Sequence, residues 1–273
     1  MSSRLHQVAV VNEEIAERGT YRGPGGAQVE VAERLAAARA GTLSYTPEQL
    51  TALLESAPSA ATAGARLEVT AEGSMQAAER LHQEGGRRIG VLNFASARNP
   101  GGGYLRGARA QEEDVCRTAL LYSCLLAAPD YYAAHRASDD LRYSHRVIFS
   151  PGVPVIRDGR GELAAQPYEV DFLTSPAPNA GQLRRRSESV DVREVLAERA
   201  LRVLAVAARH GVRELVLGAW GCGVFANDPG EVAAAFESAL VRYGTAFDRV
   251  VFAVWDRTAV SPNRAAFEAR FGS

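Results

Sequence analysis

Residues 89–114 read IGVLNFASARNPGGGYLRGARAQEED, and this stretch decides the fold. The run at 89–95 is apolar and has the length of a buried strand, and it leads into three consecutive glycines at 101–103. A pair of glutamates then precedes a helical pattern at 115–126. A strand followed by a glycine-rich loop and a helix is a unit of α/β proteins, so the stretch predicts a layered α/β fold.

The same alternation of strands and helices continues along most of the chain. We expect further strands at residues 67–70, 147–149, 153–156, 168–173, 215–217 and 250–255. We expect helices at residues 75–84, 112–127 and 190–210, one that begins after Asp228 and a last one that begins after Ser261. An alternation of this kind predicts a sandwich in which helices pack on a sheet.

Residues 1–65 are predicted to form an N-terminal helical extension, made of helices and loops. Thr46-Pro47-Glu48-Gln49 is a capping box with proline at the first helical position, and it predicts a helix to about residue 56. Residues 58–64 are rich in Ala, Ser and Thr, as a link would be. We therefore divide the chain into this extension and an α/β domain at residues 66–273.

Composition places the chain among globular proteins and argues against several classes. With 273 residues, 47% of them apolar and 23% charged, the chain can bury a large core. The net charge of −1 gives no support to direct nucleic-acid binding, which usually needs a basic surface. No apolar run approaches the ~20 residues that span a bilayer, and the acidic N-terminus does not resemble a secretion signal. We expect a cytoplasmic protein without membrane contact.

The cysteines and histidines suggest neither a disulfide framework nor a metal centre. The three cysteines, Cys116, Cys124 and Cys222, are odd in number and lack zinc-type spacing. The five histidines show no ligand spacing either. We therefore predict no metal and no cofactor.

The glycines at 101–103 and the sequence Gln111-Glu112-Glu113 are the strongest indication of chemistry. Glycines let a backbone take positive φ and approach a ligand closely, and the two carboxyls would then lie beside that ligand. Each feature alone has an ordinary explanation, because glycines make turns and acidic residues favour helix N-termini. Their combination indicates acid–base chemistry on a bound substrate.

A second glycine-rich loop, residues 218–227, lies between the strand at 215–217 and the helix after Asp228. Backbone N–H groups before a helix N-terminus attract phosphate, so the loop is a candidate anion site. The alternative is a tight turn without a ligand, which explains about half of such runs.

Together the two loops resemble those of macrodomains, which grip ADP-ribose between them. The spacing Gly-Gly-Gly, seven residues, Gln-Glu-Glu resembles the signature of bacterial-type poly(ADP-ribose) glycohydrolases. The resemblance is strong over residues 67–271 and only general before them. It implies a macrodomain-like three-layer α/β/α sandwich with a mixed sheet, and hydrolysis of the ribose–ribose bonds of poly(ADP-ribose).

The resemblance also implies roles for individual residues. Glu113 matches the catalytic glutamate, and Glu112 matches its neighbour, which holds hydroxyls of the ribose at the scissile bond. Phe225 matches an aromatic that packs near the terminal ribose, with a core aromatic as the alternative. The substrate-binding residues expected are Ser96, Asn99, Gly101, Gly102, Gly103, Gln111, Gly221, Cys222, Gly223, Val224, Phe225 and Ala226.

Geometry adds a mechanism to these roles. Adjacent residues on a helix diverge by about 100°, so Glu112 and Glu113 are not expected to straddle a bond, and one carboxyl would do most of the proton work. The expected partners are poly(ADP-ribose), ADP-ribose and ADP-ribosylated proteins. Two alternatives stay open: a hydrolase of single ADP-ribose groups on protein or nucleic acid, and a reader that only binds ADP-ribose.

Overall fold

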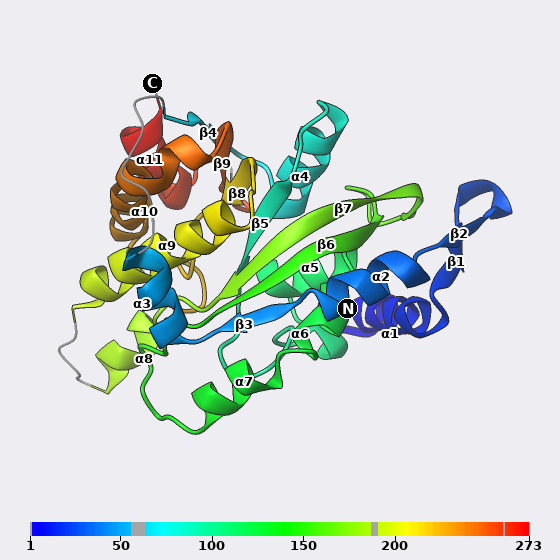
Figure 1. Cartoon of the computed structure of the whole chain (residues 1–273), viewed down its shortest axis with the longest axis horizontal. Coiled ribbons are helices and arrows are strands. Elements are labelled where there is room, and N and C mark those ends of the chain that lie inside the picture. Colours follow the sequence, from blue (N-terminus) through cyan, green and yellow to red (C-terminus); the bar gives the residue numbers. More distant parts are fainter. Residues whose placement is uncertain (1, 56–63, 187–190, 259, 273) are drawn as a thin grey trace.

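A seven-stranded mixed sheet forms the centre of the protein, in the order β3-β6-β7-β5-β8-β9-β4 (Figure 1). The computed structural model describes residues 2–55, 64–186, 191–258 and 260–272. Its strands are β1 (Thr20–Arg22), β2 (Gln28–Glu30), β3 (Leu43–Tyr45), β4 (Arg66–Thr70), β5 (Ile89–Phe94), β6 (Val147–Arg157), β7 (Leu163–Ser175), β8 (Glu214–Leu217) and β9 (Arg249–Ala253). β1 and β2 form a separate hairpin.

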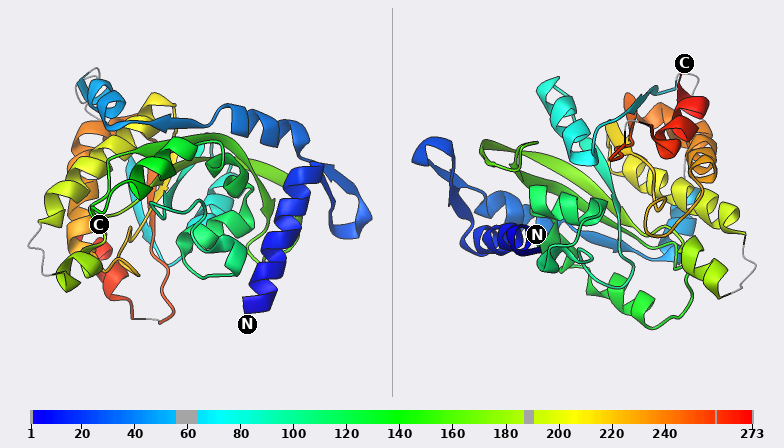
Figure 2. Two further views of the ribbon diagram at one scale, coloured as in Figure 1. Left: turned by 90° about the horizontal axis from the view of Figure 1, so that it is seen from below. Right: turned by 180° about the vertical axis from the view of Figure 1, so that it is seen from behind.

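Helices cover both faces of this sheet (Figures 1 and 2). They are α1 (Ser2–Arg18), α2 (Ala32–Ala40), α3 (Pro47–Glu55), α4 (Ser74–Gln83), α5 (Gln111–Thr118), α6 (Leu121–Leu125), α7 (Pro129–Arg136), α8 (Ala180–Arg185), α9 (Val192–Arg209), α10 (Pro229–Tyr243) and α11 (Pro262–Phe271). Short 3₁₀ turns are η1 (Pro24–Gly26), η2 (Tyr104–Arg106) and η3 (Gly244–Ala246).

The alternation of side chains along each strand produces two hydrophobic cores. Val91 of β5 packs with α4, α5 and α6 on one face, whereas its neighbour Leu92 packs with α9 and α10 on the other. Phe172 and Leu173 of β7 divide between the two cores in the same way. The predicted three-layer α/β/α sandwich with a mixed sheet is therefore confirmed.

The central strands bring the two glycine-rich loops to the same side of the sheet, at the carboxyl ends of the strands. β5 pairs in parallel with both β7 and β8, so the carboxyl ends of these three strands point the same way. The chain leaves β5 into residues 95–110 and leaves β8 into residues 218–228. Ligands of open α/β sheets bind at this kind of edge.

The first 65 residues contain strands as well as helices, so the expectation of helices and loops alone is wrong. β3 pairs antiparallel with β6 and forms an edge of the central sheet, with Leu43 opposite Phe149. Strands of three residues are too short to show a periodic pattern.

The capping box at Thr46 is confirmed, because Thr46 and Gln49 exchange hydrogen bonds. The division at residue 65 stays a prediction, and residues 56–63, including most of the expected link, lie outside the described residues.

Two further expectations are corrected by pairing with β6. The single helix expected at 112–127 is two helices, α5 and α6, because Ala119 forms a bridge with Val155 and the N–H of Leu120 donates to Pro154. The two strands expected around residues 150–152 are one strand with a register shift between Ser150 and Val153. Such a bulge lets one strand bend without ending. The expected start of the next long helix, residue 190, lies outside the described residues.

Candidate active site

Glu112 and Glu113 lie in the first turn of α5, directly beside the carboxyl end of β5. Gln111 attaches the helix to the strand, because its side chain accepts a hydrogen bond from the N–H of Phe94 and donates to the carbonyl of Leu92, both at 2.8 Å. The start of α5 is thereby held against the sheet edge at which the glycine-rich loops lie.

Glu113 is nearly buried, with 7% of its surface exposed. Its Oε1 accepts a hydrogen bond from the backbone N–H of Gly103 at 2.8 Å. Its Oε2 is buried and has no hydrogen-bond partner among the described residues. A buried carboxyl oxygen without a partner is costly, and such atoms concentrate at functional sites. Glu113 is therefore held through one oxygen, and its other oxygen is unpaired within the described residues.

Glu112 is held by both oxygens. Its Oε1 accepts from Asn93 Nδ2 at 3.2 Å and its Oε2 accepts from the N–H of Ser96 at 2.7 Å. The pKa of Glu112 is raised to about 8, mainly by burial and to a smaller extent by the neighbouring Glu113, and these hydrogen bonds oppose the rise. Glu112 therefore keeps its proton at neutral pH in the folded chain.

The two carboxyls converge on Gly102, which corrects the expectation that they diverge. A Cβ on Gly102 would lie 2.5 Å from Glu113 Oε1 and 3.0 Å from Glu112 Oε2. The side chains start on different sides of the helix but bend toward the same point of the loop. Gly102 also has a φ of +58°, so both its conformation and its surroundings require glycine.

The rest of the first loop is folded around Glu112. Ser96 Oγ accepts from the N–H of Asn99, and the carbonyl of Asn99 accepts from the N–H of Gly102. A Cβ on Gly101 would lie 2.9 Å from Tyr122. These hydrogen bonds form a turn that brings Gly103 to Glu113. The predicted contacts of Ser96, Asn99 and Gly101 with a ligand stay predictions.

The second loop presents unpaired backbone donors in the segment that precedes α10. In the described part of the chain, the N–H groups of Gly223, Val224 and Phe225 donate to no other residue. Asn227 closes the loop: its Nδ2 donates to the carbonyls of Pro178 at 2.9 Å and Gly221 at 3.1 Å. Consecutive free N–H groups before a helix form an anion site.

Comparison with known proteins agrees with this geometry. A family model described as "Microbial-type PARG, catalytic domain" matches residues 9–158. The chain belongs to the microbial-type poly(ADP-ribose) glycohydrolase family. The matched region extends across residue 65, so it includes most of the predicted extension. No curated protein matches the chain.

Solved structures of this glycohydrolase family match nearly the whole chain. Poly(ADP-ribose) glycohydrolase from Thermomonospora curvata is 47% identical, with 98% of this chain and 100% of that chain covered and a TM-score of 0.93. The enzyme from that organism bound to the inhibitor ADP-HPD matches with a TM-score of 0.91. The enzyme from Deinococcus radiodurans in complex with ADP-ribose is 43% identical, over 89% of this chain and 98% of that chain, with a TM-score of 0.80.

Phe225, in the second loop of this glycohydrolase, lies next to the loop that follows α7. It is partly buried, and its ring centroid lies 6.0 Å from that of Tyr143. Tyr143 has a φ of +60°, which is unusual for a residue with a side chain. Cys222 is partly buried, whereas Gly223, Ala226 and Val224 are exposed, Val224 with 86% of its surface.

Sequence reasoning missed two buried residues that support the candidate site. Asn93 is buried in β5 and donates to Glu112; a lone asparagine in an apolar strand was the available signal. Arg199 of α9 is fully buried and donates to the carbonyls of Pro176, Arg142 and Tyr143, at 2.7, 2.7 and 3.1 Å. Arg199 therefore holds the backbone of Tyr143, whose ring lies beside that of Phe225.

Clusters of metal ligands and membrane-spanning helices are both absent from the described residues. Within the described residues, no group of three or more His, Cys, Asp and Glu side chains could hold a metal ion. Over the same residues, no helix has the length and apolar character needed to cross a membrane.

Proposed function

We propose that this chain hydrolyses the ribose–ribose O-glycosidic bonds of poly(ADP-ribose) and releases ADP-ribose, with Glu113 as the general acid and base. The observation that carries the role of Glu113 is its Oε2, which is buried and has no partner in the described chain. Family membership and the likeness to enzymes of this activity support the substrate.

The proposed steps follow from the positions of the two glutamates. Protonated Glu113 donates its proton to the ribose oxygen that leaves the anomeric carbon, as the glycosidic C–O bond breaks. A water molecule then attacks the oxocarbenium-like carbon and returns a proton to Glu113. Glu112, which is protonated at neutral pH because of its raised pKa, binds ribose hydroxyls beside it.

The second loop is proposed to bind the diphosphate. The free N–H groups of Gly223, Val224 and Phe225 supply hydrogen-bond donors there. A bound diphosphate places negative charge near Glu113 and favours the protonated form that the first step needs. The substrate thus helps to prepare the acid.

Further proposals concern the setting of this activity. ADP-ribosylated proteins are the expected carriers of the substrate, and the cytoplasm is the expected compartment. Residues 1–65 are proposed as an extension of the catalytic domain at 66–273. The mechanism uses no metal, so activity in EDTA should equal activity with added Mg²⁺ or Zn²⁺.

The test compares wild type with Glu113→Gln on poly(ADP-ribosyl)ated and mono(ADP-ribosyl)ated protein, with the released products identified by chromatography. Glutamine keeps the shape of the side chain but cannot supply an acid proton, so turnover should fall by ~10²–10⁴-fold. Calorimetry should give an affinity for ADP-ribose near that of wild type. Glu14→Gln, at an exposed glutamate of α1, is the matched control and should keep full turnover.

Each result decides between the candidate functions. Release of ADP-ribose from polymer by wild type, lost in Glu113→Gln with binding retained, supports the proposal. Cleavage of the mono-ADP-ribosylated target alone would assign the second hydrolase function. Binding without cleavage by wild type would make the chain a reader, and near-native cleavage by Glu113→Gln would remove the catalytic assignment.

A further inference from the structure

One face of the N-terminal helix α1 contacts the first glycine-rich loop, residues 95–110, which is called the catalytic loop below. His6 Nδ1 lies 2.7 Å from the carbonyl oxygen of Leu105. Tyr104, in the loop, donates its hydroxyl hydrogen bond to Glu13 Oε1 at 3.1 Å and lies 3.4 Å from the carbonyl oxygen of Ala9. The contacts come from residues spaced by three or four along α1, which share one face of a helix.

Tyr104 directly follows the residue that holds Glu113. The N–H of Gly103 donates to Glu113 Oε1, so any shift of the backbone at Tyr104 changes the position of the carboxyl. The Tyr104 side chain is 1% exposed, and burial raises the pKa of its hydroxyl, so the hydroxyl stays protonated and acts as a donor. The hydrogen bond to Glu13 thus anchors the residue that directly follows Gly103, whose N–H holds Glu113.

A second contact ties α1 to the other end of the catalytic helix. Asn12 is fully buried, and its Nδ2 donates to the carbonyls of Cys116 at 3.3 Å and Arg117 at 2.8 Å in α5. Its Oδ1 accepts from Arg157 of β6 at 2.8 and 3.0 Å. Helix α1 therefore holds both the loop that contacts Glu113 and the helix that carries it.

We propose that α1 positions the catalytic loop, and that Glu13 and Tyr104 are positioning residues for Glu113, an inference that rests on the proposed function of Glu113. Packing alone does not require this arrangement, because a buried phenylalanine would fill the place of Tyr104 without a hydroxyl partner. The hydroxyl and the partly buried carboxyl of Glu13 add direction to the contact. The N-terminal segment is then part of the active site's support.

The test compares Tyr104→Phe with a matched control, Tyr21→Phe. Tyr21 is also buried, and its hydroxyl donates to the carbonyl of Ala164 at 2.7 Å, at the amino end of β7 and away from the glutamates. Both variants lose one hydroxyl hydrogen bond and should lower the melting temperature by similar amounts. Only Tyr104→Phe should lower kcat, by about fivefold or more, with KM within about twofold of wild type, because loss of positioning lowers the rate of the chemical step.

Two further variants separate positioning from loss of stability. Glu13→Ala should reproduce the fall in kcat, and adding it to Tyr104→Phe should lower kcat no further, because both remove the same contact. Glu13→Gln keeps an acceptor oxygen and should restore most of the rate. Equal kcat in Tyr104→Phe, Tyr21→Phe and wild type would overturn the proposal.

Hydrogen exchange gives a readout that does not depend on activity. Deuterium uptake over residues 99–107 should rise in Tyr104→Phe and not in Tyr21→Phe, since loosening of the loop exposes the N–H of Gly103. If wild type cleaves no polymer, the proposed function fails while this measurement still tests the positioning. If uptake is unchanged in Tyr104→Phe, the positioning inference fails whatever the activity of wild type.

Discussion

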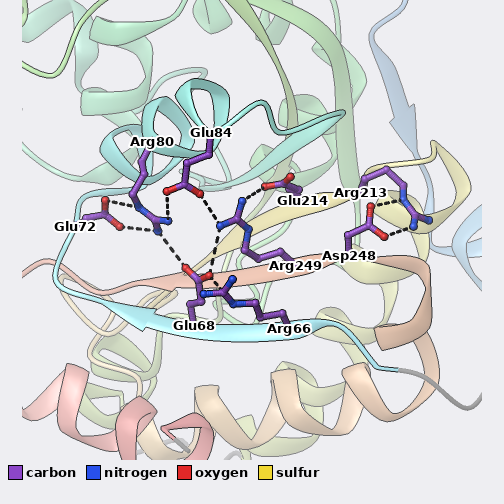
Figure 3. A network of polar contacts seen from close by, with 9 residues as sticks. All are labelled: Arg66, Glu68, Glu72, Arg80, Glu84, Arg213, Glu214, Asp248 and Arg249. Carbon is purple, nitrogen blue, oxygen red and sulfur yellow. Dashed lines mark hydrogen bonds and ion pairs between the residues drawn. The ribbon is translucent and has the colours of Figure 1, made fainter.

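The acidic side chains of this protein occur in two contrasting surroundings. Near β4, β9 and β8, acidic side chains form ion pairs with arginines (Figure 3). Arg249 there lies 3.4 Å from Glu68, 2.7 Å from Glu84 and 3.0 Å from Glu214. At the carboxyl end of β5, Glu112 and Glu113 are buried, and neither forms an ion pair within the described residues.

The contrast concerns the protonation state of the carboxyl groups. In the network of Figure 3, a hydrogen bond from Arg249 lowers the pKa of Glu84, so the carboxylate stays ionised and paired. Beside β5, burial without an arginine raises the pKa of Glu112 to about 8. The protonated carboxyl of Glu112 lies beside Glu113, the group to which the proposed function gives the acid–base role.

The largest effect should come from titrating Glu112. Burial raises its pKa from 4.5 to about 8, so between these values the folded chain binds a proton that the unfolded chain has released. The contribution of this proton to the free energy of unfolding is therefore full below pH 4.5 and is lost as the pH rises through about 8. Because each unit of pKa shift corresponds to about 1.4 kcal/mol, the loss amounts to several kcal/mol.

Thermal unfolding of wild type and Glu112→Gln between about pH 5 and about pH 9 measures this effect. Glutamine is neutral at every pH, so the variant should gain stability relative to wild type as the pH rises. A difference between the two melting temperatures that is the same at every pH would contradict the raised pKa.

The next effect should come from Gly102→Ala, which pushes the two carboxyls apart. The added Cβ would lie 2.5 Å from Glu113 Oε1, so turnover should fall by about 100-fold, or about 2.7 kcal/mol of activation free energy. Gly85→Ala is the matched control, because Gly85 also has positive φ but has nothing within 4 Å of its Cβ position. Steady-state kinetics should show normal turnover in the control; equal losses in both variants would attribute the effect to backbone strain.

A smaller effect is expected for Phe225→Ala, which removes the ring that faces Tyr143. Turnover should fall by about tenfold or more, or at least ~1.4 kcal/mol, if the ring orders the terminal ribose. Phe271→Ala removes an aromatic of the core, stacked on Phe252 at 4.2 Å, and should lower the melting temperature without lowering kcat of the folded enzyme. Wild-type kinetics in folded Phe225→Ala would make Phe225 a core aromatic.

Local patterns were sufficient to predict the layered fold and the two loops. The strand, glycine loop and helix at 89–114 lie next to one another in sequence, so their order predicted that the glutamate pair lies near the glycine loop. The hydrogen bond from Gly103 to Glu113 was not predicted. The capping residues Asp228 and Ser261 also begin the helices expected of them, since each accepts a hydrogen bond from the N–H three residues later.

What the sequence could not supply depends on contacts between distant residues. The break between α5 and α6 arises because Ala119 pairs with Val155, a partner that no local pattern identifies. The convergence of Glu112 and Glu113 arises because the loop backbone donates to both, which overrides the divergence of adjacent helical positions. Asn12 reaches Arg117 across more than a hundred residues for the same reason.

The smallest effect is expected for Arg213→Gln, in the separate, exposed ion pair of Figure 3. Arg213 pairs with Asp248, and the two side chains are 45% and 60% exposed, so solvent screens the attraction. The free energy of unfolding should fall by less than ~1 kcal/mol, with a smaller difference at high salt and unchanged turnover. Arg249→Gln, in which the arginine is 15% exposed, should cost more because it leaves the carboxylate of Glu214, which is only 12% exposed, without its arginine. Denaturant unfolding of both variants at low and high salt measures the difference, and an equal loss in the two would show that burial does not distinguish the pairs of this network.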